Sequence, residues 1–428
     1  MLTTGGRRFG TLTNKEFVKY ASCRFCKSNK ITKVITLGKM PLAGGFLKNI
    51  ADFKNEKKFP LDLFFCRECY LIQTSIAINP DKLFKKYFYF SSKIQTLIDH
   101  FQKTALKINK SLKNGSFVVE IGCNDGEFIK ALQKNGYRAL GIDPASNIVK
   151  PLIKTGAPII NDYFSENLAK KIVKKHGQAD AIYSFHTLAH IPDMLDIIKG
   201  IKLLLKSEGY LAFEVHYIGD LLKGLQYDMI YHEHLHYYSL LSLKNLFKQF
   251  NMEIFKIEKN KVRAGSITYF VQNINTKRIR INSSVLELEK EERRQKLNTI
   301  IPYLNFNSKI QKSKNDLITL VKKLKKKNLK IAGYGASGRG TIMTNYCNLS
   351  PKFIDFVVDD SSAKENHFMP GTHNLILNPI ELLKQKVDYA IVFAWPFITE
   401  IRKRNIQFIK NGGKLIIPLP KITITNEK

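Results

Sequence analysis

The stretch FVVEIGCNDGEFIKALQKNGYRALGID, residues 117–143, determines the fold class that the sequence predicts. An apolar strand leads through a glycine-bearing loop into a helix that ends in glycine, and a second apolar strand follows. The alternation continues with strands at 157–162 and 179–185 and with a helix and a strand within 190–217. Strands that alternate with helices of about ten residues form mostly parallel sheets covered on both faces. We therefore predict an α/β fold.

The remaining segments extend this pattern in both directions. A helical stretch is expected from Asp81 to Lys113, and the β-rich stretches 252–260 and 266–273 are expected to close the sheet as an antiparallel pair. The helix within 190–217 should end near Glu208-Gly209, and the polar first twenty residues read as a loose arm. We predict four consecutive parts, namely an arm with a cysteine module, a sheet domain, a helical connector and a second, Rossmann-like α/β domain, at residues 1–80, 81–280, 281–330 and 331–428.

The composition is that of a globular protein with a large positive charge. Of the 428 residues, 44% are hydrophobic and 25% are charged, and 69 Lys and Arg against 36 Asp and Glu give a net charge of +33. The lysines are scattered through every segment, which favours solvated faces over a dedicated groove for a polyanion. No apolar run is long enough to cross a membrane and no signal peptide is evident, so we expect a cytoplasmic protein without membrane insertion.

Four of the six cysteines form two C-x2-C pairs. Cys23 and Cys26 make the first pair, and Cys66 and Cys69 make the second after 39 intervening residues. Each pair can present two thiolates on one side of a tight turn, and two such turns complete a closed tetrahedral zinc site. Because sulfur fills all four positions, the predicted zinc is structural and stabilises a module with a small core. The alternative is four unrelated core cysteines.

The loop GCNDG, which follows the first strand, predicts a cofactor site. A ligand can approach backbone amides there, and Asp143, 21 residues after Gly122, can accept hydrogen bonds from ribose hydroxyls. The loop lacks G-x-G-x-x-G and carries acid in place of the third glycine, which suits a cofactor without pyrophosphate, such as S-adenosylmethionine. A plain turn is the alternative. The predicted cofactor residues are Gly122, Asn124, Asp125, Gly126, Asp143 and Asp162.

A literal G-x-G-x-x-G occurs in GYGASGRG, Gly333–Gly340, between a predicted strand and a predicted helix. It indicates either a nicotinamide or flavin site, or a turn that keeps its glycines for packing alone, and the sequence leaves both interpretations open. Asp359 and Asp360 end the following strand, which is late for an acid that binds ribose.

Three histidines and a glutamate lie in YHEHLHYYS, Tyr231–Ser239. His232-Glu233-x-x-His236 has the spacing of a zinc protease, but that site requires a helix, and this stretch is an aromatic-rich insertion directly after a strand. At the carboxyl end of the sheet, the insertion is expected to lie over the cofactor pocket. A general base beside a methyl donor is the preferred interpretation, and surface or packing histidines are the alternative.

The ordered combination of motifs resembles the sugar C-methyltransferases that act on nucleotide-linked 4-keto-deoxysugars. The resemblance spans about residue 20 to the C-terminus and rests on CRFC, CREC, YFYFSS, EIGCNDG, GIDPA, LAHIPD, YHEH, GYGASGRG, VVDDSSAKENHFMPGT and FAWPF. It implies an N-terminal zinc-binding domain, a class I methyltransferase domain that binds S-adenosylmethionine, and a C-terminal Rossmann-like domain without a redox cofactor of its own. It therefore weakens the nicotinamide interpretation of GYGASGRG.

The resemblance also implies roles for individual residues. His234, the second histidine of YHEH, is the expected base that removes a proton from C3 of the sugar. Donors near the keto group would stabilise the charge that develops on the C4 oxygen, and the enolate carbon would accept the methyl group. The residues implied for the sugar site are His234, His190, Tyr231, Glu233, Tyr89 and Tyr87.

Three residues depart from the family pattern. Phe185 and His186 stand where a pair of asparagines is usual, and Pro396 stands where asparagine is common. The nucleotide, the sugar and the exact methylated carbon therefore stay open.

We expect a monomer whose partner is a nucleotide-linked sugar and whose product enters a surface polysaccharide or a glycosylated metabolite. Two other classes are a nucleic-acid methyltransferase, which lacks support because no N/D-P-P-Y tetrapeptide lies near the fourth strand, and a non-catalytic zinc-ribbon binding protein.

Overall fold

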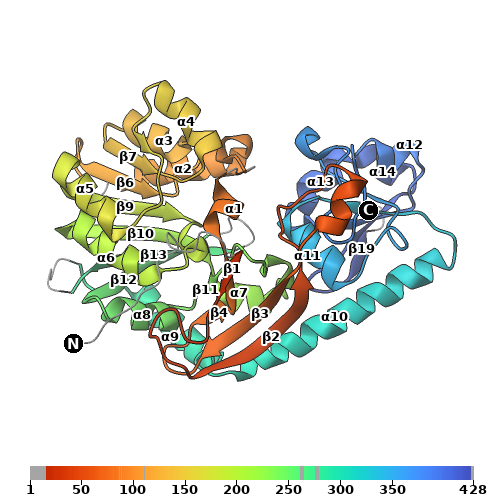
Figure 1. Cartoon of the computed structure of the whole chain (residues 1–428), viewed down its shortest axis with the longest axis horizontal. Coiled ribbons are helices and arrows are strands. Elements are labelled where there is room, and N and C mark those ends of the chain that lie inside the picture. The colour runs from red at the N-terminus through yellow and green to blue at the C-terminus, as the bar shows by residue number, and fades with distance from the viewer. Residues whose placement is uncertain are drawn as a thin grey trace. The chain divides into compact units, whose positions relative to one another are not determined.

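The computed structural model of the chain describes residues 16–85, 87, 89–109, 111–260, 265–274 and 279–425. The chain divides into two compact units, each assembled from separate stretches. Unit 1 comprises the chain up to Ile31, Ser75–His216 and Leu240–Glu291, and unit 2 comprises Thr32–Thr74, Tyr217–Ser239 and Glu292–Lys428. Figure 1 labels the elements of both units. Within the described part of the chain, no helix is both long and apolar enough to span a membrane.

Unit 1 is built on a seven-stranded sheet of order β12-β13-β10-β9-β6-β7-β8. The strands from β10 to β8 are mutually parallel, and β12 and β13 form an antiparallel pair at one edge. The predicted α/β fold is therefore confirmed, including the antiparallel closure. The strands are β6 (Phe117–Ile121), β7 (Arg138–Ile142), β8 (Ile159–Ile160), β9 (Ala179–Phe185), β10 (Leu205–His216), β12 (Met252–Asn260) and β13 (Ser266–Asn273).

Helices cover both faces of this sheet, as right-handed connections between parallel strands require. The helices α2, α3 and α4 contribute Phe101, Phe128 and Val149 to one hydrophobic core. The chain reverses its direction along the sheet after β8, so α5 and α6 pack against each other on the opposite face. The helices are α2 (Gln95–Ile108), α3 (Glu127–Lys134), α4 (Ser146–Lys154), α5 (Glu166–His176), α6 (Met194–Leu204), α8 (Leu240–Lys248) and α9 (Ser283–Arg294).

In its described residues, the helical stretch expected from Asp81 to Lys113 contains three helical elements but is interrupted between them. The short α1 (Pro80–Phe84) is followed by a 3-10 turn, η3 (Ser91–Lys93), and only then by α2. The side chain of Asn124 binds the Tyr89 carbonyl and the first amide of η3, at 3.0 Å each. These backbone groups therefore bond to the loop after β6 instead of to a helix.

The helix α6 ends earlier than the expected Glu208-Gly209. Its last residue is Leu204, and Leu205 already pairs with Ala179 of β9. Nε2 of Gln178 donates to the carbonyls of Leu203 (3.1 Å) and Leu205 (3.0 Å) and so caps the helix end. The glycine does not mark the helix end, because it lies where the register of β10 against β9 shifts.

The expected loose arm of twenty residues is described only in part, since residues 1–15 lie outside the described residues. Phe17–Lys19 forms β1, which pairs antiparallel with β5 (Ile76–Ile78). This end of the arm is therefore not loose, because its backbone donors and acceptors are used in a strand pair.

Unit 2 contains two sheets. The first has the order β11-β4-β3-β2, in which β4 pairs antiparallel with both neighbours. The second has the order β16-β15-β14-β17-β18-β19 and is parallel except for β19, which confirms the second α/β domain. The strands are β2 (Ile31–Met40), β3 (Phe59–Cys66), β4 (Ile72–Thr74), β11 (His236–Tyr237), β14 (Ile331–Tyr334), β15 (Phe356–Val358), β16 (Ile376–Leu377), β17 (Tyr389–Val392), β18 (Lys414–Ile417) and β19 (Thr423–Thr425).

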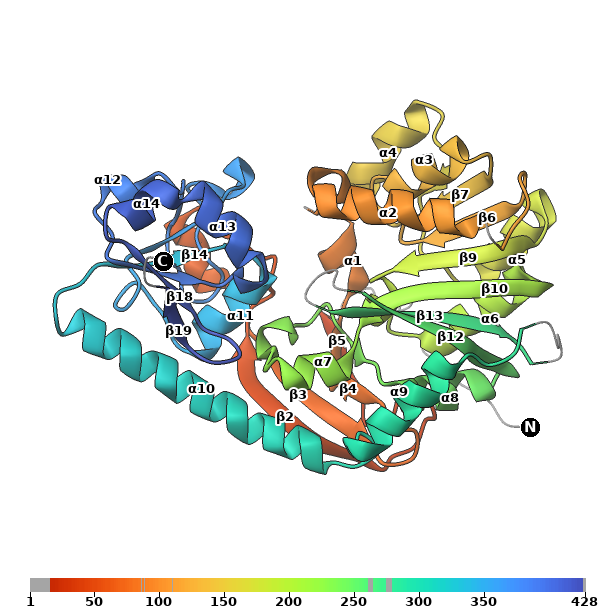
Figure 2. The same cartoon turned by 180° about the vertical axis from the view of Figure 1, so that it is seen from behind.

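The helix α10 (Ile301–Lys325) runs for 25 residues within the predicted connector and is seen at full length in Figure 2. Its buried residues lie three, four or seven positions apart, from Tyr303 and Phe306 to Val321 and Leu324, and so form one apolar stripe. The other short elements of unit 2 are η2 (Ile50–Asn55), α7 (Ile218–Lys223), η5 (Tyr227–Met229), α11 (Gly338–Tyr346), η7 (Ser362–Lys364), α12 (Glu381–Lys384), η8 (Trp395–Phe397), α13 (Ile398–Arg404) and α14 (Ile406–Lys410).

Candidate functional site

The two cysteine pairs occupy turns of the same construction. In each turn the amide of the first cysteine donates to the carbonyl five residues later, at 2.9 Å. The amide four residues later also donates to the carbonyl of the first cysteine: Lys27 to Cys23 at 3.0 Å and Tyr70 to Cys66 at 2.9 Å. Lys27 and Tyr70, which follow the two pairs directly, have positive φ values of 63° and 65°. Because the two turns share this backbone geometry, each turn presents its pair of thiols in the same way.

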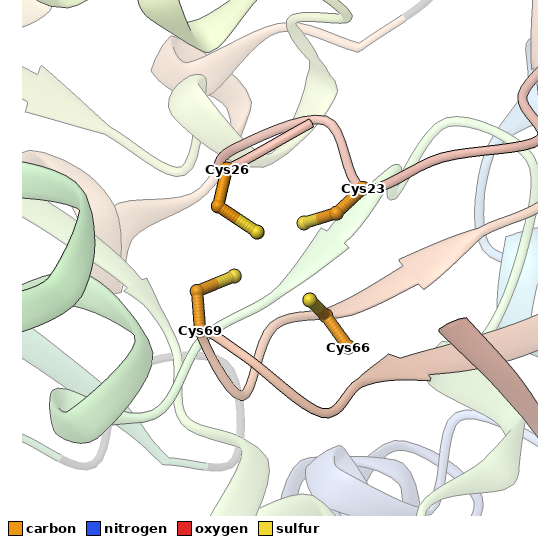
Figure 3. Close-up of side chains that lie close together, drawn as sticks. All are labelled: Cys23, Cys26, Cys66 and Cys69. Carbon is orange, nitrogen blue, oxygen red and sulfur yellow. The ribbon is translucent and has the colours of Figure 1, made fainter. Parts of the chain in front are cut away.

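The four sulfur atoms of these turns form one cluster, and all lie within 4.8 Å of one another (Figure 3). Tetrahedral zinc with Zn–S bonds of about 2.3 Å separates its sulfurs by about 3.8 Å, so the cluster fits this ion. The members are Cys23, Cys26, Cys66 and Cys69; three are buried, and none forms a disulfide. With four protein ligands the site is closed, as expected of a structural zinc.

The loop after β6 turns sharply over the carboxyl end of β7. Gly122 and Gly126 have φ values of +82° and +75°, and Asn124 between them has a φ of 48°. A side chain at residue 122 would collide with that of Thr187, so glycine is required there. The Gly122 amide donates to the last carbonyl of β7 (2.8 Å), and the Asn124 amide donates to the carboxylate of Asp143 (2.9 Å). The structure therefore brings the predicted loop and the predicted acid together.

Three carboxyl groups gather at this loop. Burial raises the pKa of Glu120 well above its usual value, and the charges of Asp143 and Asp125 raise it further. Burial also raises the pKa of Asp143, although its carboxylate accepts from the amides of Asn124 (2.9 Å) and Ala145 (2.8 Å). Oε2 of Glu120 and Oδ1 of Asp125 have no hydrogen-bond partner among the described residues. A ligand with a cation and hydroxyl donors complements this cluster, whereas a pyrophosphate would be repelled.

Glu120 is absent from the residues predicted for the cofactor. Its signal in the sequence is a single acid inside the otherwise apolar strand FVVEI, all of which is buried. The predicted Asp162 is exposed, and its carboxylate accepts from the amide of Tyr163 (2.8 Å). The preceding residue, Asn161, donates to the carbonyl of Asp143 (3.0 Å), which ties this segment to the end of β7.

The described residues of the YFYFSS motif lie against the cofactor loop. The Ser92 amide donates to the carboxylate of Asp125 (3.0 Å). The side chain of Asn147 in α4 binds both the amide and the carbonyl of Tyr87, at 3.0 and 2.9 Å. The rings of Tyr87 and Tyr89 have centroids 6.3 Å apart. Both candidate tyrosines are therefore held beside the loop by backbone hydrogen bonds.

His190 ends the short turn η4 (Leu188–His190), which follows β9. Its ring packs edge-on against Phe84 with centroids 5.6 Å apart, and Phe84 packs in the same way against Tyr87 at 5.8 Å. Thr187, which precedes the turn, is the residue that occupies the space beside Gly122. The structure thus brings His190, the candidate tyrosines and the cofactor loop together within unit 1.

A cluster of the buried His186 and Glu214 with the half-buried His100 is a feature that the sequence does not predict. The two carboxylate oxygens of Glu214 contact Nε2 of His186 (2.9 Å) and Nε2 of His100 (2.8 Å). Although burial opposes ionisation of Glu214, these hydrogen bonds hold its pKa well below the usual range. The family-divergent His186 therefore has a partner, but 28 residues separate the two, and no local pattern links them.

The insertion YHEHLHYYS is not helical. His236 belongs to β11 and pairs with Gln73 of β4. Nε2 of His232 lies 3.3 Å from the carbonyls of Phe59 and Pro60, and burial lowers the pKa of His232 to about 4. The zinc-protease interpretation of H-E-x-x-H therefore fails, because its two histidines must share one face of a helix.

His234 is held by the backbone around it. Its Nδ1 lies 2.9 Å from the Met229 carbonyl, its amide donates to the Tyr231 carbonyl (3.0 Å), and its ring lies 4.1 Å from the ring of Tyr231. A carbonyl oxygen can only accept, so Nδ1 carries the hydrogen and Nε2 of the neutral imidazole keeps its lone pair. Burial raises the pKa of the neighbouring Glu233 to about 7.

Packing and backbone conformation within unit 2 account for three glycines of GYGASGRG, namely Gly333, Gly335 and Gly340, whereas Gly338 has only ordinary contacts. A methyl group on Gly333 would overlap the ring of Phe393, and one on Gly340 would overlap the carbonyl of Gly335. Gly335 itself has a φ of +103°, which side chains rarely adopt. The two acids after β15 pair with basic side chains of the same unit, Asp359 with Lys364 (3.2 Å) and Asp360 with Arg404 (3.0 Å).

Comparison with known families divides the chain in the order that the motifs predict. Residues 23–84 match the family described as "Putative zinc binding domain", residues 90–257 match "Methyltransferase domain", and residues 261–420 match "C-methyltransferase C-terminal domain". The C-methyltransferase NovU of Streptomyces niveus is 32% identical over 401 residues, which cover 93% of this chain and 95% of the relative. The chain belongs to this C-methyltransferase family.

Other similarities of this C-methyltransferase cover less of its length. A ubiquinone biosynthesis O-methyltransferase of Xanthomonas campestris is 30% identical over 99 residues, which are 23% of this chain and 41% of the relative. Among solved structures, the PH0226 protein of Pyrococcus horikoshii is 14% identical, covers 45% of this chain and 98% of its own, and gives a TM-score of 0.35. The magnesium protoporphyrin IX methyltransferase of Synechocystis with bound SAM is 14% identical, covers 42% and 79%, and gives a TM-score of 0.31.

The C-methyltransferase uses S-adenosylmethionine and zinc as its cofactors. S-adenosylmethionine carries a sulfonium, an ammonium group and two ribose hydroxyls, and these groups complement the buried carboxyl groups of Glu120, Asp125 and Asp143. The four-cysteine cluster supplies the zinc ligands. The residues present therefore fit both groups.

Replacement of Cys66 by serine should abolish stoichiometric zinc binding and lower the melting temperature, because the cluster loses one of its four thiolates. Metal analysis and thermal unfolding of the purified protein measure both effects. The matched control is Cys347→Ser, since Cys347 is buried but is not part of the cluster. Equal zinc content in the Cys66→Ser variant and the wild type would contradict the assignment.

Asp143→Asn should raise the dissociation constant of S-adenosylmethionine by about tenfold to a hundredfold, as expected when a hydrogen bond to a charged group is weakened. Isothermal titration calorimetry of the zinc-loaded protein measures it. Glu287→Gln, an exposed acid of the same unit, is the control and should bind as the wild type does. Unchanged binding in Asp143→Asn would remove this residue from the cofactor site.

The raised pKa of Glu233 predicts a pH-dependent stability. The unfolded chain releases this proton near pH 4.3 and the folded chain near pH 7. Between these values the folded state binds more protons, so its stability falls as the pH rises. As the pH rises from 5 to 8, the free energy of unfolding of Glu233→Gln should therefore increase by about 2 kcal/mol relative to that of the wild type. Urea unfolding at both pH values measures it, with exposed Glu400→Gln as the control; identical pH dependence in wild type and Glu233→Gln would refute the shift.

Proposed function

We propose that the protein transfers the methyl group of S-adenosylmethionine to C3 of a nucleotide-linked 4-keto-deoxysugar, after His234 removes the proton from that carbon. Membership of the C-methyltransferase family supports transfer to carbon. The ordered sugar-methyltransferase motifs, from CRFC to FAWPF, support the sugar as substrate. The hydrogen bond between Nδ1 of His234 and the Met229 carbonyl carries the assignment of the base.

Transfer to carbon requires a base because a sugar carbon has no lone pair. The hydrogen on C3 becomes acidic only because the adjacent C4 is a ketone. When Nε2 of His234 accepts this proton, the electrons of the C–H bond form the C3–C4 double bond and the carbonyl oxygen takes the negative charge. When bound, S-adenosylmethionine would supply a methyl group on a positively charged sulfur. Attack by the enolate carbon would break the methyl–sulfur bond, and the sulfur would keep the bonding electrons as a neutral thioether.

The tautomer of His234 suits this role. Because Nδ1 donates to a backbone carbonyl at 2.9 Å, the proton-accepting lone pair is confined to Nε2. The ring of Tyr231 packs on the imidazole, with centroids 4.1 Å apart, and restricts its rotation. Glu233 and Tyr231 are proposed to line the sugar site beside the base. Its contacts thus leave His234 with a defined orientation and one basic nitrogen.

The residues of unit 1 that would stabilise the enolate are His190 and a tyrosine of YFYFSS, either Tyr89 or Tyr87. An N–H or O–H donor that is already in position stabilises the developing oxyanion without reorganisation. The aromatic cluster of Phe84 with His190 and Tyr87 supports this assignment, because it holds these rings beside the cofactor loop. We propose that the cofactor contacts Gly122, Asn124, Asp125, Gly126, Asp143 and Asp162 of the same unit.

His234→Gln should lower methyl transfer by about a hundredfold to ten-thousandfold, the usual contribution of a general base. It should also abolish exchange of the C3 proton in heavy water without methyl donor, a reaction that needs the base alone. Both rates are measured with a panel of nucleotide-linked 4-ketosugars. The control is His373→Gln, because His373 pairs with Glu56 in the same unit (2.9 Å). Undiminished exchange in His234→Gln would assign the base elsewhere.

A further inference from the structure

A buried carboxylate in unit 2 contacts both of the motifs that methyl transfer does not explain. Asp228 in η5 is fully buried. Its Oδ2 accepts from Arg339 of GYGASGRG (3.1 Å) and from Nε1 of Trp395 in FAWPF (2.8 Å). The guanidinium of Arg339 also lies 5.3 Å from the centroid of the Trp395 ring. Burial raises the pKa of Asp228, and the charge of Arg339 opposes the rise.

The two donors come from neighbouring parallel strands of the C-terminal sheet. Arg339 lies in the first turn of α11, directly after the glycine turn that follows β14, and Trp395 lies in η8 after β17. Because parallel strands place their carboxyl ends at one edge, both side chains reach the same point. Pro396 is compatible with this arrangement, since it occupies an early position of η8 where a backbone N–H is not required.

A short path of bonds leads from Asp228 to the proposed base. The next residue, Met229, provides the carbonyl that accepts from Nδ1 of His234 at 2.9 Å. On the other side, the hydroxyl of Tyr227 lies 3.5 Å from the sulfur of Cys347, and its ring packs on Tyr346 at the end of α11. The turn η5, whose Met229 carbonyl binds His234, is therefore held at two points. Tyr227 contacts the C-terminal end of α11, and Asp228 binds Arg339 and Trp395.

We propose that Asp228, bound by Arg339 and Trp395, is a positioning residue that fixes the tautomer and orientation of His234, and that the C-terminal α/β domain acts as the scaffold of the base. This inference rests on the proposed function. It explains why the glycine turn is kept, since Gly333, Gly335 and Gly340 allow the close packing from which α11 and Arg339 project. It also explains the indole at residue 395, because its ring N–H can donate to a carboxylate and cannot act as an acceptor.

The first test needs no substrate. Full-length, zinc-loaded protein with 15N-labelled histidine is compared with Asp228→Asn and Trp395→Phe, and the His234 signals are assigned by their loss in His234→Gln. The wild type should show one His234 tautomer with the proton on Nδ1. Both variants should shift these signals toward a mixture of tautomers. The controls Phe397→Leu and Arg404→Gln, which change exposed residues of the same domain, should leave them unchanged. Unchanged signals in folded Asp228→Asn and Trp395→Phe would overturn the proposal.

The second test measures C3 proton exchange and methyl transfer. Trp395→Phe and Asp228→Asn should lower both rates by about tenfold to a hundredfold, the cost of a misplaced catalytic group, with less than about a threefold change in KM. A rise in KM alone, with normal His234 signals, would overturn the proposal, because Arg339 or Trp395 would then contact the substrate. If the wild type itself exchanges no proton on any 4-ketosugar, the proposed function fails, while the histidine spectra still test the positioning role.

Discussion

A hydrogen bond of 2.9 Å between Nδ1 of His234 and the Met229 carbonyl determines what this imidazole can do. A neutral histidine has one N–H and one lone pair, and the carbonyl leaves only the lone pair of Nε2 for chemistry. The other two histidines of the insertion have different contacts. His232 binds backbone carbonyls of the strand β3, and His236 lies in a strand. One sequence motif therefore contains a candidate base and two residues that hold the fold.

At the cofactor loop, the charge of the carboxyl groups determines which ligand is favoured. Burial raises the pKa values of Glu120 and Asp143 at the ends of β6 and β7, and neighbouring carboxylates raise them further. This cluster would repel a pyrophosphate, although the strand, turn and helix are those of a dinucleotide-binding fold. A cationic cofactor removes this repulsion. In the C-terminal domain the glycine pattern of a dinucleotide site occurs instead, and its first two glycines, Gly333 and Gly335, are required by packing and by a positive φ. The glycine spacing alone therefore does not identify the ligand; the neighbouring charges carry more information.

Features with local signals could be predicted from the sequence. Apolar strands, glycine-ended helices and two C-x2-C turns each lie within about ten residues, and the parallel sheet, its antiparallel closure and the four-cysteine cluster are confirmed. The predicted end of α6 is wrong, because Gln178 caps the helix before the glycine is reached. The pairs Asp228–Arg339 and His186–Glu214 could not be found, because only the tertiary fold brings residues 111 and 28 positions apart into contact. The four-part domain division and the place of His234 over the cofactor stay predictions.

The most direct measurement of carbon methylation is an NMR spectrum of the product formed with S-adenosylmethionine that carries 13C in its methyl group. Direct coupling between the labelled methyl carbon and C3 of a 13C-enriched 4-ketosugar is expected, together with retention of the ketone at C4. A labelled methyl group attached to oxygen or nitrogen would contradict the enolate chemistry and with it the role of His234.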